Sequence, residues 1–347
     1  MKTKFYSWRK GKLAEGCKHC VLGRKSVLFI TGLCNKKCWY CPISDKKKNK
    51  DVIYINERPV KNFKDIIDEI KLCESKGVGI TGGDPLIVLD KVVEYIKLLK
   101  RKFGKKFHIH LYTPLNLVTK AKLSKLFKAG LDEIRFHPDL DGDVLDKIKL
   151  ARDFDWSVGV EIPVIPGYGE KIKDLIDKID VDFLNLNELE ISDTNANKIV
   201  EKGFRAKDDI SYGVKGSQEL ALKLLKYCEK KKFRVHYCTV KLKDAVQLIN
   251  RIKLRAKNVK KKYDILTKNG SLIRGVIEGR NLEKLRRDLI EEFDIPGDLI
   301  EIDDKRILTS IVVLEDLKKD LKKKKLKFYI VEEIPTWDHF EIQTWDV

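Results

Sequence analysis

The chain has 347 residues, of which 43% are hydrophobic and 36% are charged. This length suits one large α/β domain with a smaller appendage. Because no run of eighteen uncharged apolar residues and no apolar N-terminal leader is present, we expect a cytoplasmic protein with no membrane partner. The formal net charge of +19 is carried mainly by lysine. Such an excess is typical of RNA-binding surfaces and also of heat-adapted, thermophilic proteins, so both interpretations stay open.

Short β-branched segments alternate with amphipathic helical patterns over the first 240 residues. Repeated strand–helix units predict a parallel sheet, here an α/β fold with a full or partial (βα)6-7 barrel of the TIM type. In such barrels the functional residues lie at the C-terminal ends of the strands. We expect helices over residues 62–76 and 89–102. The expected strands cover 26–32, 77–82, 107–113, 132–137, 157–164, 181–189 and 233–239.

The pattern changes near residue 258, where a βαββαβ order begins. This order predicts a small ferredoxin-like α+β domain over 258–347, after an N-terminal segment (1–23) and a core barrel (24–257). A tail rich in Trp and acidic residues (335–345) is expected to pack its aromatic rings for stability. The expected strands are 271–279, 299–304, 306–310 and 326–334, and the expected helices are 281–293 and 313–324.

Three cysteines follow the first expected barrel strand within eight residues, in the segment "GLCNKKCWYCP". Three thiolates hold three irons of a cubane cluster and leave the fourth iron open, whereas a fourth cysteine would close the cluster for electron transfer. A zinc site would more usually show paired CxxC motifs. The spacing of Cys34, Cys38 and Cys41 therefore favours an open cubane cluster over zinc, and the family resemblance that follows implies that this is a [4Fe–4S] cluster.

The spacing CxxxCxΦC, with the aromatic Tyr40 before the last cysteine, resembles the signature of the radical S-adenosylmethionine (radical SAM) superfamily. The segment "GITGGDP" after the second strand is similar to the Gly-Gly-Glu motif of that family, with Asp84 in place of Glu. The resemblance implies that the amino group of SAM binds at Gly82, Gly83 and Asp84. Other cofactor-binding residues implied by it are Tyr40, Arg135, His137 and Gly167.

The resemblance also implies an activity. One electron from the reduced cluster cleaves SAM, and the resulting 5′-deoxyadenosyl radical abstracts hydrogen from a substrate, with ferredoxin or flavodoxin as electron donor. The residue order resembles a group of archaeal proteins related to pyruvate formate-lyase activating enzyme. RNA, a protein and a cofactor precursor remain open as substrates, and the catalytic acid or base is unknown. The alternative is an iron–sulfur carrier or redox sensor that does not cleave SAM.

A second group of candidate metal ligands lies before the first expected barrel strand and on the last one. Cys17 and Cys20 form a CxxC motif, and His236 and Cys238 point to the same face of an expected strand. We hypothesise a second metal site built from Cys17, Cys20 and Cys238, with His236 as the candidate fourth ligand, that binds either an auxiliary iron–sulfur cluster or a zinc ion. The alternative is that these cysteines bind no metal. Two further cysteines, Cys73 and Cys228, follow helical periodicity and are expected to fill the core.

Overall fold

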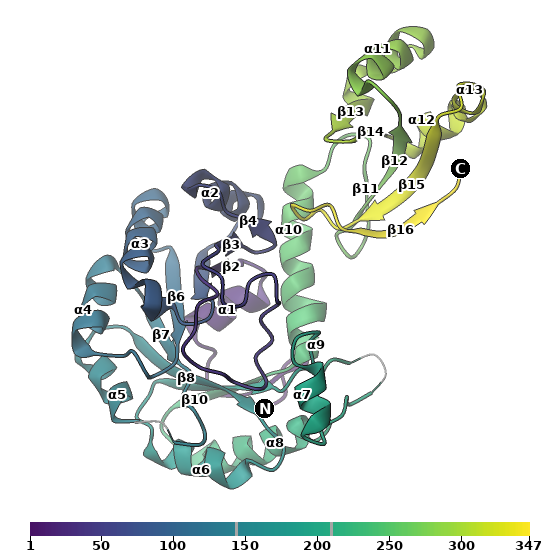
Figure 1. Ribbon diagram of the computed structural model, residues 1–347. Coiled ribbons are helices and arrows are strands. Elements are labelled where there is room, and N and C mark those ends of the chain that lie inside the picture. Colours follow the sequence, from purple (N-terminus) through teal and green to yellow (C-terminus); the bar gives the residue numbers. More distant parts are fainter. Residues whose placement is uncertain (143–144, 209–210) are drawn as a thin grey trace. The chain divides into compact units, whose positions relative to one another are not determined.

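The computed structural model describes residues 1–142, 145–208 and 211–347. The chain forms two compact units, one made of Met1–Lys71 with Ser75–Leu248 and the other of Leu72–Glu74 with Ile249–Val347 (Figure 1). Among the described residues, no helix is long and apolar enough to cross a membrane.

The larger unit is built on a ten-stranded sheet in which seven strands run parallel in chain order. All seven coincide with predicted strands. Three short strands extend the sheet antiparallel: β1 (Trp8–Lys10) pairs with β10, and the hairpin of β3 (Tyr54–Ile55) and β4 (Arg58–Pro59) pairs with β2. No pairing among the described residues joins β1 to β4, so the barrel is partial. The parallel strands are β2 (Lys25–Phe29), β5 (Gly77–Thr81), β6 (His108–Thr113), β7 (Glu133–Phe136), β8 (Ser157–Val164), β9 (Phe183–Glu188) and β10 (Arg234–Cys238).

Helices cover the outer face of this sheet, as Figure 1 shows. Apolar side chains on alternate strand positions, such as Val78, Ile80, Ile109 and Leu111, are fully buried in the core cluster of this unit. The two predicted helices are confirmed as α2 (Phe63–Leu72) and α3 (Leu89–Phe103). The remaining helices of the unit are α4 (Lys120–Ala129), α5 (Asp146–Lys149), α6 (Gly169–Lys178), α7 (Ala196–Glu201), α8 (Ser217–Tyr227) and α9 (Val240–Leu242), with the short 3-10 helices η1 (Pro85–Val88), η2 (Leu150–Asp153) and η3 (Cys228–Lys230) and the π-helix η4 (Lys243–Leu248).

A short helix, α1 (Glu15–Val21), packs against the inner face of the sheet. A Cβ atom on Gly16 would lie 2.3 Å from His110 Nδ1 and 2.6 Å from Arg135 Nη2, and both of these residues point inward. The Gly16 N–H donates to Glu133 Oε2 at 3.4 Å. The N-terminal segment therefore fills part of the barrel interior, where the sequence analysis placed no helix.

The smaller unit contains an antiparallel sheet with the order β13-β14-β12-β15-β16. Its βαββαβ core confirms the ferredoxin-like prediction, since the first strand lies between the third and the fourth. The tail prediction was wrong for Trp337 and Phe340, which are exposed, whereas the third ring, Trp345 on β16, is half-buried. The elements are α10 (Ile249–Val259), β11 (Ile265–Leu266), β12 (Leu272–Glu278), α11 (Leu282–Phe293), η5 (Gly297–Leu299), β13 (Ile300–Asp303), β14 (Arg306–Thr309), α12 (Ile311–Asp316), α13 (Lys318–Lys323), β15 (Lys327–Glu333) and β16 (Glu341–Trp345).

Candidate active site

The three clustered cysteines lie on a closed loop, residues 32–50, that follows β2 and is called the cysteine loop below. Its base is held by two backbone hydrogen bonds: Gly32 N–H donates to the Lys50 carbonyl at 2.7 Å, and Asn49 N–H donates to the Gly32 carbonyl at 2.9 Å. A Cβ atom at position 32 would lie 1.7 Å from the Lys47 carbonyl oxygen, so only glycine allows this closure.

The thiols of Cys34, Cys38 and Cys41 are half-buried. Burial raises the pKa of the Cys34 and Cys38 thiols, and the Lys36 N–H donates to Cys34 Sγ at 3.3 Å. Among residues 1–142, 145–208 and 211–347, no three His, Cys, Asp or Glu side chains converge as a ready metal site. The donor set itself, three thiols on one loop, fits an open [4Fe–4S] cluster.

Two contacts anchor the cysteine loop, one to the end of β7 and one to the start of α7. The Tyr40 hydroxyl lies 3.0 Å from His137 Nε2, and His137 Nδ1 lies 2.9 Å from the Glu161 carbonyl oxygen. A carbonyl only accepts, so Nδ1 donates its proton and Nε2 accepts from the tyrosine. Asn195 Nδ2 donates to the Tyr40 carbonyl at 3.0 Å. These bonds fix the backbone directly before Cys41.

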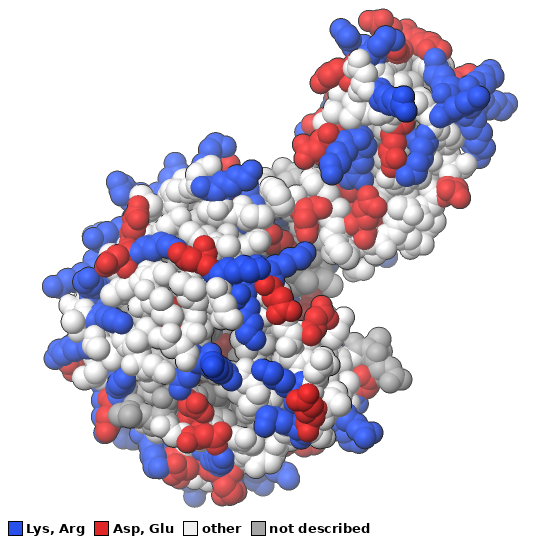
Figure 2. Space-filling view, in the orientation of Figure 1, with Lys and Arg blue, Asp and Glu red and all other residues white. Residues whose placement is uncertain are grey.

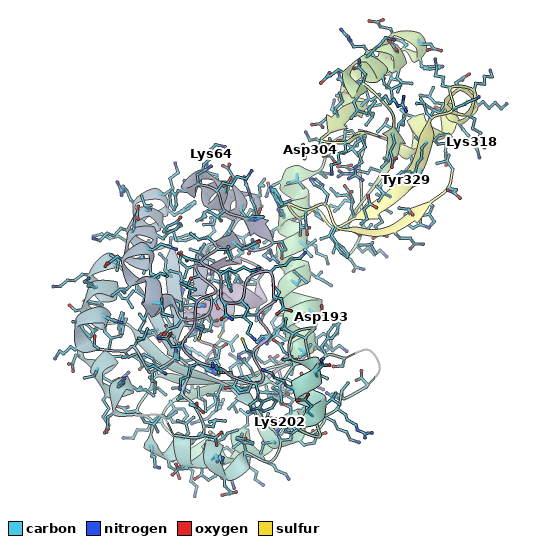
Figure 3. All side chains as sticks on the ribbon, in the orientation of Figure 1. Lys64, Asp193, Lys202, Asp304, Lys318 and Tyr329 are labelled. Carbon is cyan, nitrogen blue, oxygen red and sulfur yellow. The ribbon has the colours of Figure 1, made fainter. Side chains whose placement is uncertain are left out.

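A ring stack adds a third anchor. The Trp39 ring lies 5.7 Å from the ring of Phe204, with only 4° between their planes. Lys202, labelled in Figure 3, holds its ammonium 5.2 Å from the centre of the Trp39 ring. The aromatic side chains of the loop are therefore occupied by contacts within the protein.

The Gly-Gly-Asp segment follows β5 and lies directly against the cysteine loop. A Cβ atom on Gly82 would approach the Thr31 carbonyl to 2.2 Å, and one on Gly83 would approach the Leu33 carbonyl to the same distance. The N–H groups of Gly83 and Asp84 donate to these carbonyls of Thr31 and Leu33. The glycines thus allow two backbone segments to touch, and their own carbonyl oxygens accept no hydrogen bond among those described.

Asp84, the last residue of the Gly-Gly-Asp segment, is almost fully buried. Its Oδ1 atom accepts from the Leu86 N–H at 3.0 Å, which caps η1, and from the Thr113 hydroxyl at 2.9 Å. Its Oδ2 atom is buried and has no partner. Burial raises the pKa of Asp84. A buried carboxylate oxygen without a partner is the kind of atom that a cationic group stabilises.

Arg135 lies at the centre of a buried polar network on the inner face. Its guanidinium contacts Glu133 Oε1 through Nε at 2.7 Å, and its Nη1 donates to Glu161 Oε2 at 2.9 Å and to the Tyr112 hydroxyl at 3.0 Å. The pKa of Glu161 is lowered because Arg135 and the amide of Asn185 outweigh the effect of burial. The Arg135 guanidinium is thus held by the carboxylates of Glu133 and Glu161.

The second predicted group of ligands faces the same interior. Cys17 Sγ accepts from Arg135 Nη2 and from Asn185 Nδ2, both at 3.4 Å. Both ring nitrogens of His236 are buried without a partner, and burial lowers the pKa of this imidazole to about 4. Cys20 follows on α1, and Cys238 ends β10 two residues after His236. The fold brings α1 and β10 to one interior, but the four side chains do not form a preformed metal site.

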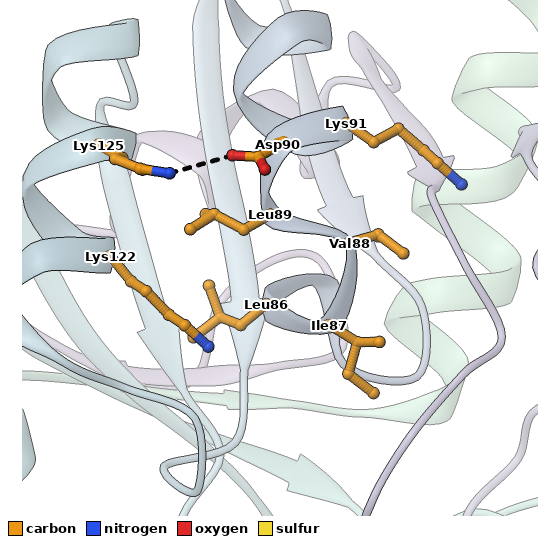
Figure 4. Close-up of a pocket in the computed structure, with 8 residues that line it drawn as sticks. All are labelled: Leu86, Ile87, Val88, Leu89, Asp90, Lys91, Lys122 and Lys125. Atoms are coloured by element: carbon orange, nitrogen blue, oxygen red, sulfur yellow. Dashed lines mark hydrogen bonds and ion pairs between the residues drawn. The ribbon is translucent and has the colours of Figure 1, made fainter.

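The other predicted positions are simpler. Gly167 follows β8 with φ +87°, a backbone conformation that favours glycine, and a Cβ atom there would meet nothing within 4 Å. Cys73 and Cys228 are fully buried, as expected for core residues. A surface pocket of about 360 Å³ lies between η1, the start of α3 and α4, and holds the Asp90–Lys125 ion pair (Figure 4). It lies outside the polar interior of the barrel.

Several polar residues of the barrel interior were not among the predicted site residues. They are strand residues at alternate positions, facing inward where barrel interiors usually carry Val, Ile or Leu. The signal was present in the segments "HIHLY", "EIRFH" and "NLNE", where every second residue is polar although both faces are buried. The overlooked residues are Lys25, His108, His110, Tyr112, Glu133, Glu161, Asn185 and Asn187.

Comparison with known proteins bears on the family of this chain. The profile of the radical SAM superfamily matches residues 28–179, and a family described as a domain of unknown function matches residues 270–347. A protein of Methanocaldococcus jannaschii is 43% identical over 96% of this chain and 92% of its own length, and bears the provisional name glycyl-radical enzyme activating enzyme.

Solved structures resemble the fold more distantly. A radical S-adenosylmethionine methyltransferase from Kitasatospora setae, with tryptophan and a SAM analogue bound, is 12% identical with a TM-score of 0.40, over 75% of this chain and 57% of that one. The chain thus spans little more than half of that enzyme. Coproporphyrinogen III oxidase from Escherichia coli is 11% identical with a TM-score of 0.33, over 86% and 90%.

The cysteine signature on its closed loop, the matched profile and the full-length relative lead to one family. The chain belongs to the radical SAM superfamily and is a radical SAM enzyme.

Proposed function

We propose that this enzyme holds a [4Fe–4S] cluster on Cys34, Cys38 and Cys41 and SAM beside Gly82, Gly83 and Asp84. When bound, the cluster supplies one electron that cleaves SAM to methionine and a 5′-deoxyadenosyl radical, which takes a hydrogen atom from the substrate. The observation that carries the proposal is the direct backbone contact between the cysteine loop and the Gly-Gly-Asp segment.

The chain's own groups have distinct tasks in this proposal. The carbonyl oxygens of Gly82 and Gly83, which accept no described hydrogen bond, would accept from the ammonium of SAM, and the unpartnered Oδ2 of the adjacent Asp84 would favour its positive charge. Tyr40 and His137 orient the loop from its far side. Gly167 and Arg135 are the further positions proposed for cofactor contact, and at Arg135 the existing ion pairs with Glu133 and Glu161 would position its guanidinium.

The substrate class that we favour is a protein. The name of the relative supports this choice, since 43% identity spans almost both chains. We further propose that the protein acts in the cytoplasm, in keeping with its eight free cysteines.

SAM cleavage tests the function. Anaerobically reconstituted protein is reduced with dithionite in the presence of SAM, and 5′-deoxyadenosine is quantified with and without cell extract. We expect SAM-dependent 5′-deoxyadenosine from the parent protein and none from Cys38→Ala. Its absence from the parent under both conditions would favour the iron–sulfur carrier. Transfer of label from extract proteins into 5′-deoxyadenosine supports the protein class, whereas transfer from RNA or small molecules contradicts it.

The second metal site is part of the same proposal. Cys17, Cys20, Cys238 and His236 would bind zinc or an auxiliary cluster, supported by the two unpartnered nitrogens of His236. Iron and zinc are measured in the triple variant Cys34→Ala, Cys38→Ala, Cys41→Ala, which lacks the first ligand set. Retained metal that is lost on adding Cys17→Ser is the expected result. A triple variant without metal would show that the second site is wrong, and Cys228→Ser is the matched control.

A further inference from the structure

The cysteine loop is strongly basic. Between Gly32 and Lys50 the chain has six lysines and a single aspartate, a formal charge of +5. On the face seen in Figure 2, by contrast, acidic and basic side chains are interspersed over much of the surface. The loop therefore concentrates positive charge at the segment that carries the three clustered thiols.

Three of these lysines are free to meet a partner. Lys36 pairs with Asp139, the ammonium of Lys47 lies 4.2 Å from the Tyr54 ring centre, and Lys50 donates to the Asp45 carbonyl. Lys37 and Lys46 are exposed and Lys48 is half-exposed, and none of the three forms an ion pair in the described part of the chain. The remaining lysines thus present charge that the protein itself does not neutralise.

A nucleic acid would need more than charge from this surface. Sequence-tolerant binding of single strands combines basic side chains with exposed aromatic platforms. The two aromatic rings of the loop are occupied, Trp39 by its stack on Phe204 and Tyr40 by its bond to His137. The loop also contains no arginine, the residue that best recognises phosphate in two-point geometry.

We propose that the cysteine loop is the docking surface for the electron donor, a small redox protein with an acidic surface around its prosthetic group, attracted by Lys37, Lys46 and Lys48. The inference rests on the proposed function, which needs one electron to reach the loop's cluster. The donor loses that electron and the cluster gains it, so no proton or further reactant is required. Complementary charge accelerates such an encounter by 10- to 1,000-fold and does so less at high salt.

Reduced flavodoxin serves as the probe. It is mixed anaerobically with the reconstituted full chain, and the loss of the cluster's visible absorbance is timed over a series of salt concentrations. In the variant Lys37→Glu, Lys46→Glu, Lys48→Glu we expect the rate with flavodoxin to fall about tenfold or more at low salt and its salt dependence to flatten. With dithionite, a small reductant that needs no docking surface, the rate should match the parent's.

The matched control changes three lysines at the opposite ends of the strands: Lys76→Glu, Lys105→Glu and Lys106→Glu. These residues lie in the exposed connections before β5 and β6. Iron content is measured in every variant, and a Lys→Gln version of the loop variant replaces any that fails to load iron. An unchanged flavodoxin rate in the loop variant, or an equal loss in the control, would overturn the proposal.

The two proposals fail in different ways. If the loop variant loses tRNA binding while flavodoxin still reduces it at the parent rate, the loop is a nucleic-acid surface and the donor proposal is wrong. If dithionite reduces the parent cluster but no 5′-deoxyadenosine forms from SAM, the proposed function fails. In that case the flavodoxin rates still decide whether the loop receives the donor.

Discussion

At the scale of single residues, two of the three glycines of the candidate SAM site, Gly83 and Gly167, differ in what a side chain would meet there. Gly83 has no room for a side chain, since its Cβ would meet the Leu33 carbonyl at 2.2 Å and Cys34 Cβ at 2.9 Å. Gly167 has room but adopts φ +87°, which strains any other residue. A methyl group at each position therefore isolates one physical effect.

We predict that Gly83→Ala lowers the free energy of unfolding by about 1–3 kcal/mol, because backbone must move away from the new atom. The same variant should bind less iron, since the displaced segment carries Cys34. Gly167→Ala should cost about 1 kcal/mol of backbone strain with iron content unchanged. Urea unfolding and iron analysis of both variants check this, and equal iron loss in the two would contradict the steric explanation.

His108 predicts a pH dependence. It is 8% exposed, its Nδ1 lies 2.8 Å from Lys25 Nζ, and burial together with that ammonium lowers its pKa to about 2. The unfolded chain, with an imidazole pKa of about 6.5, then binds the extra proton. Keeping His108 neutral therefore costs the folded state nothing above about pH 6.5, but as the pH falls toward 2 proton binding increasingly stabilises the unfolded chain. By about pH 5 the loss amounts to about 2 kcal/mol.

The variant His108→Gln tests this linkage, since glutamine can still accept from Lys25 but does not titrate. We expect its free energy of unfolding, measured with urea on metal-free protein, to fall by about 2 kcal/mol less than the parent's between about pH 7 and pH 5. If the free energy of unfolding fell equally in the two proteins, His108 would be protonated in the folded state and the linkage would be wrong.

At the scale of elements, α1 reverses the usual effect of an alanine substitution. Replacing a helical glycine by alanine normally stabilises a helix by about 0.5–1 kcal/mol. Here the new methyl group would collide with His110 and Arg135, which are buried and held by Glu133. We predict that Gly16→Ala destabilises the protein by about 1–3 kcal/mol. Lys18→Ala, on the exposed side of the same helix, should change stability by less than about 0.5 kcal/mol in thermal unfolding. A stabilising Gly16→Ala would place α1 outside the barrel.

The same helix shows where sequence-based prediction succeeds and where it ends. The seven barrel strands were predictable because most have β-branched residues between turn signals, as in "SVGVEIPV", which is β8 to the residue. Helix α1 was not predictable, since seven residues with two cysteines carry too little periodicity, and the helix depends on contacts with several barrel strands, among them β2, β5 and β6.

The candidate site divides in the same way. The clustered cysteines and the Gly-Gly-Asp segment are local patterns, and local spacing is what a sequence displays. The contacts Tyr40–His137 and Arg135–Glu161 join residues 97 and 26 positions apart in the chain, so they depend on strand order and register. No local sequence pattern predicts strand order or register. The alternating polar residues in the strands are a local signal of a polar interior, but they do not say which of these residues meet.

At the scale of the whole molecule, the two compact units have separate cores, and this separation predicts separate stability. Glu333 on β15 is 1% exposed and forms ion pairs with Arg274, at 3.0 Å, and with Arg306, at 2.6 Å. Removing one partner of a buried ion pair leaves an uncompensated charge and costs about 3–5 kcal/mol. All three residues belong to the smaller unit.

The variant Glu333→Gln should therefore weaken only the smaller unit. In native-state hydrogen exchange we expect the amides of β12 and β15 to lose protection, while those of β5 to β8 in the larger unit keep theirs. Arg306 also pairs with Asp303 and Glu341, so Glu341→Gln, at the exposed end of that network, is the milder control. Equal loss of protection in both units would mean that they unfold together, because the larger unit would then draw its stability from the smaller one.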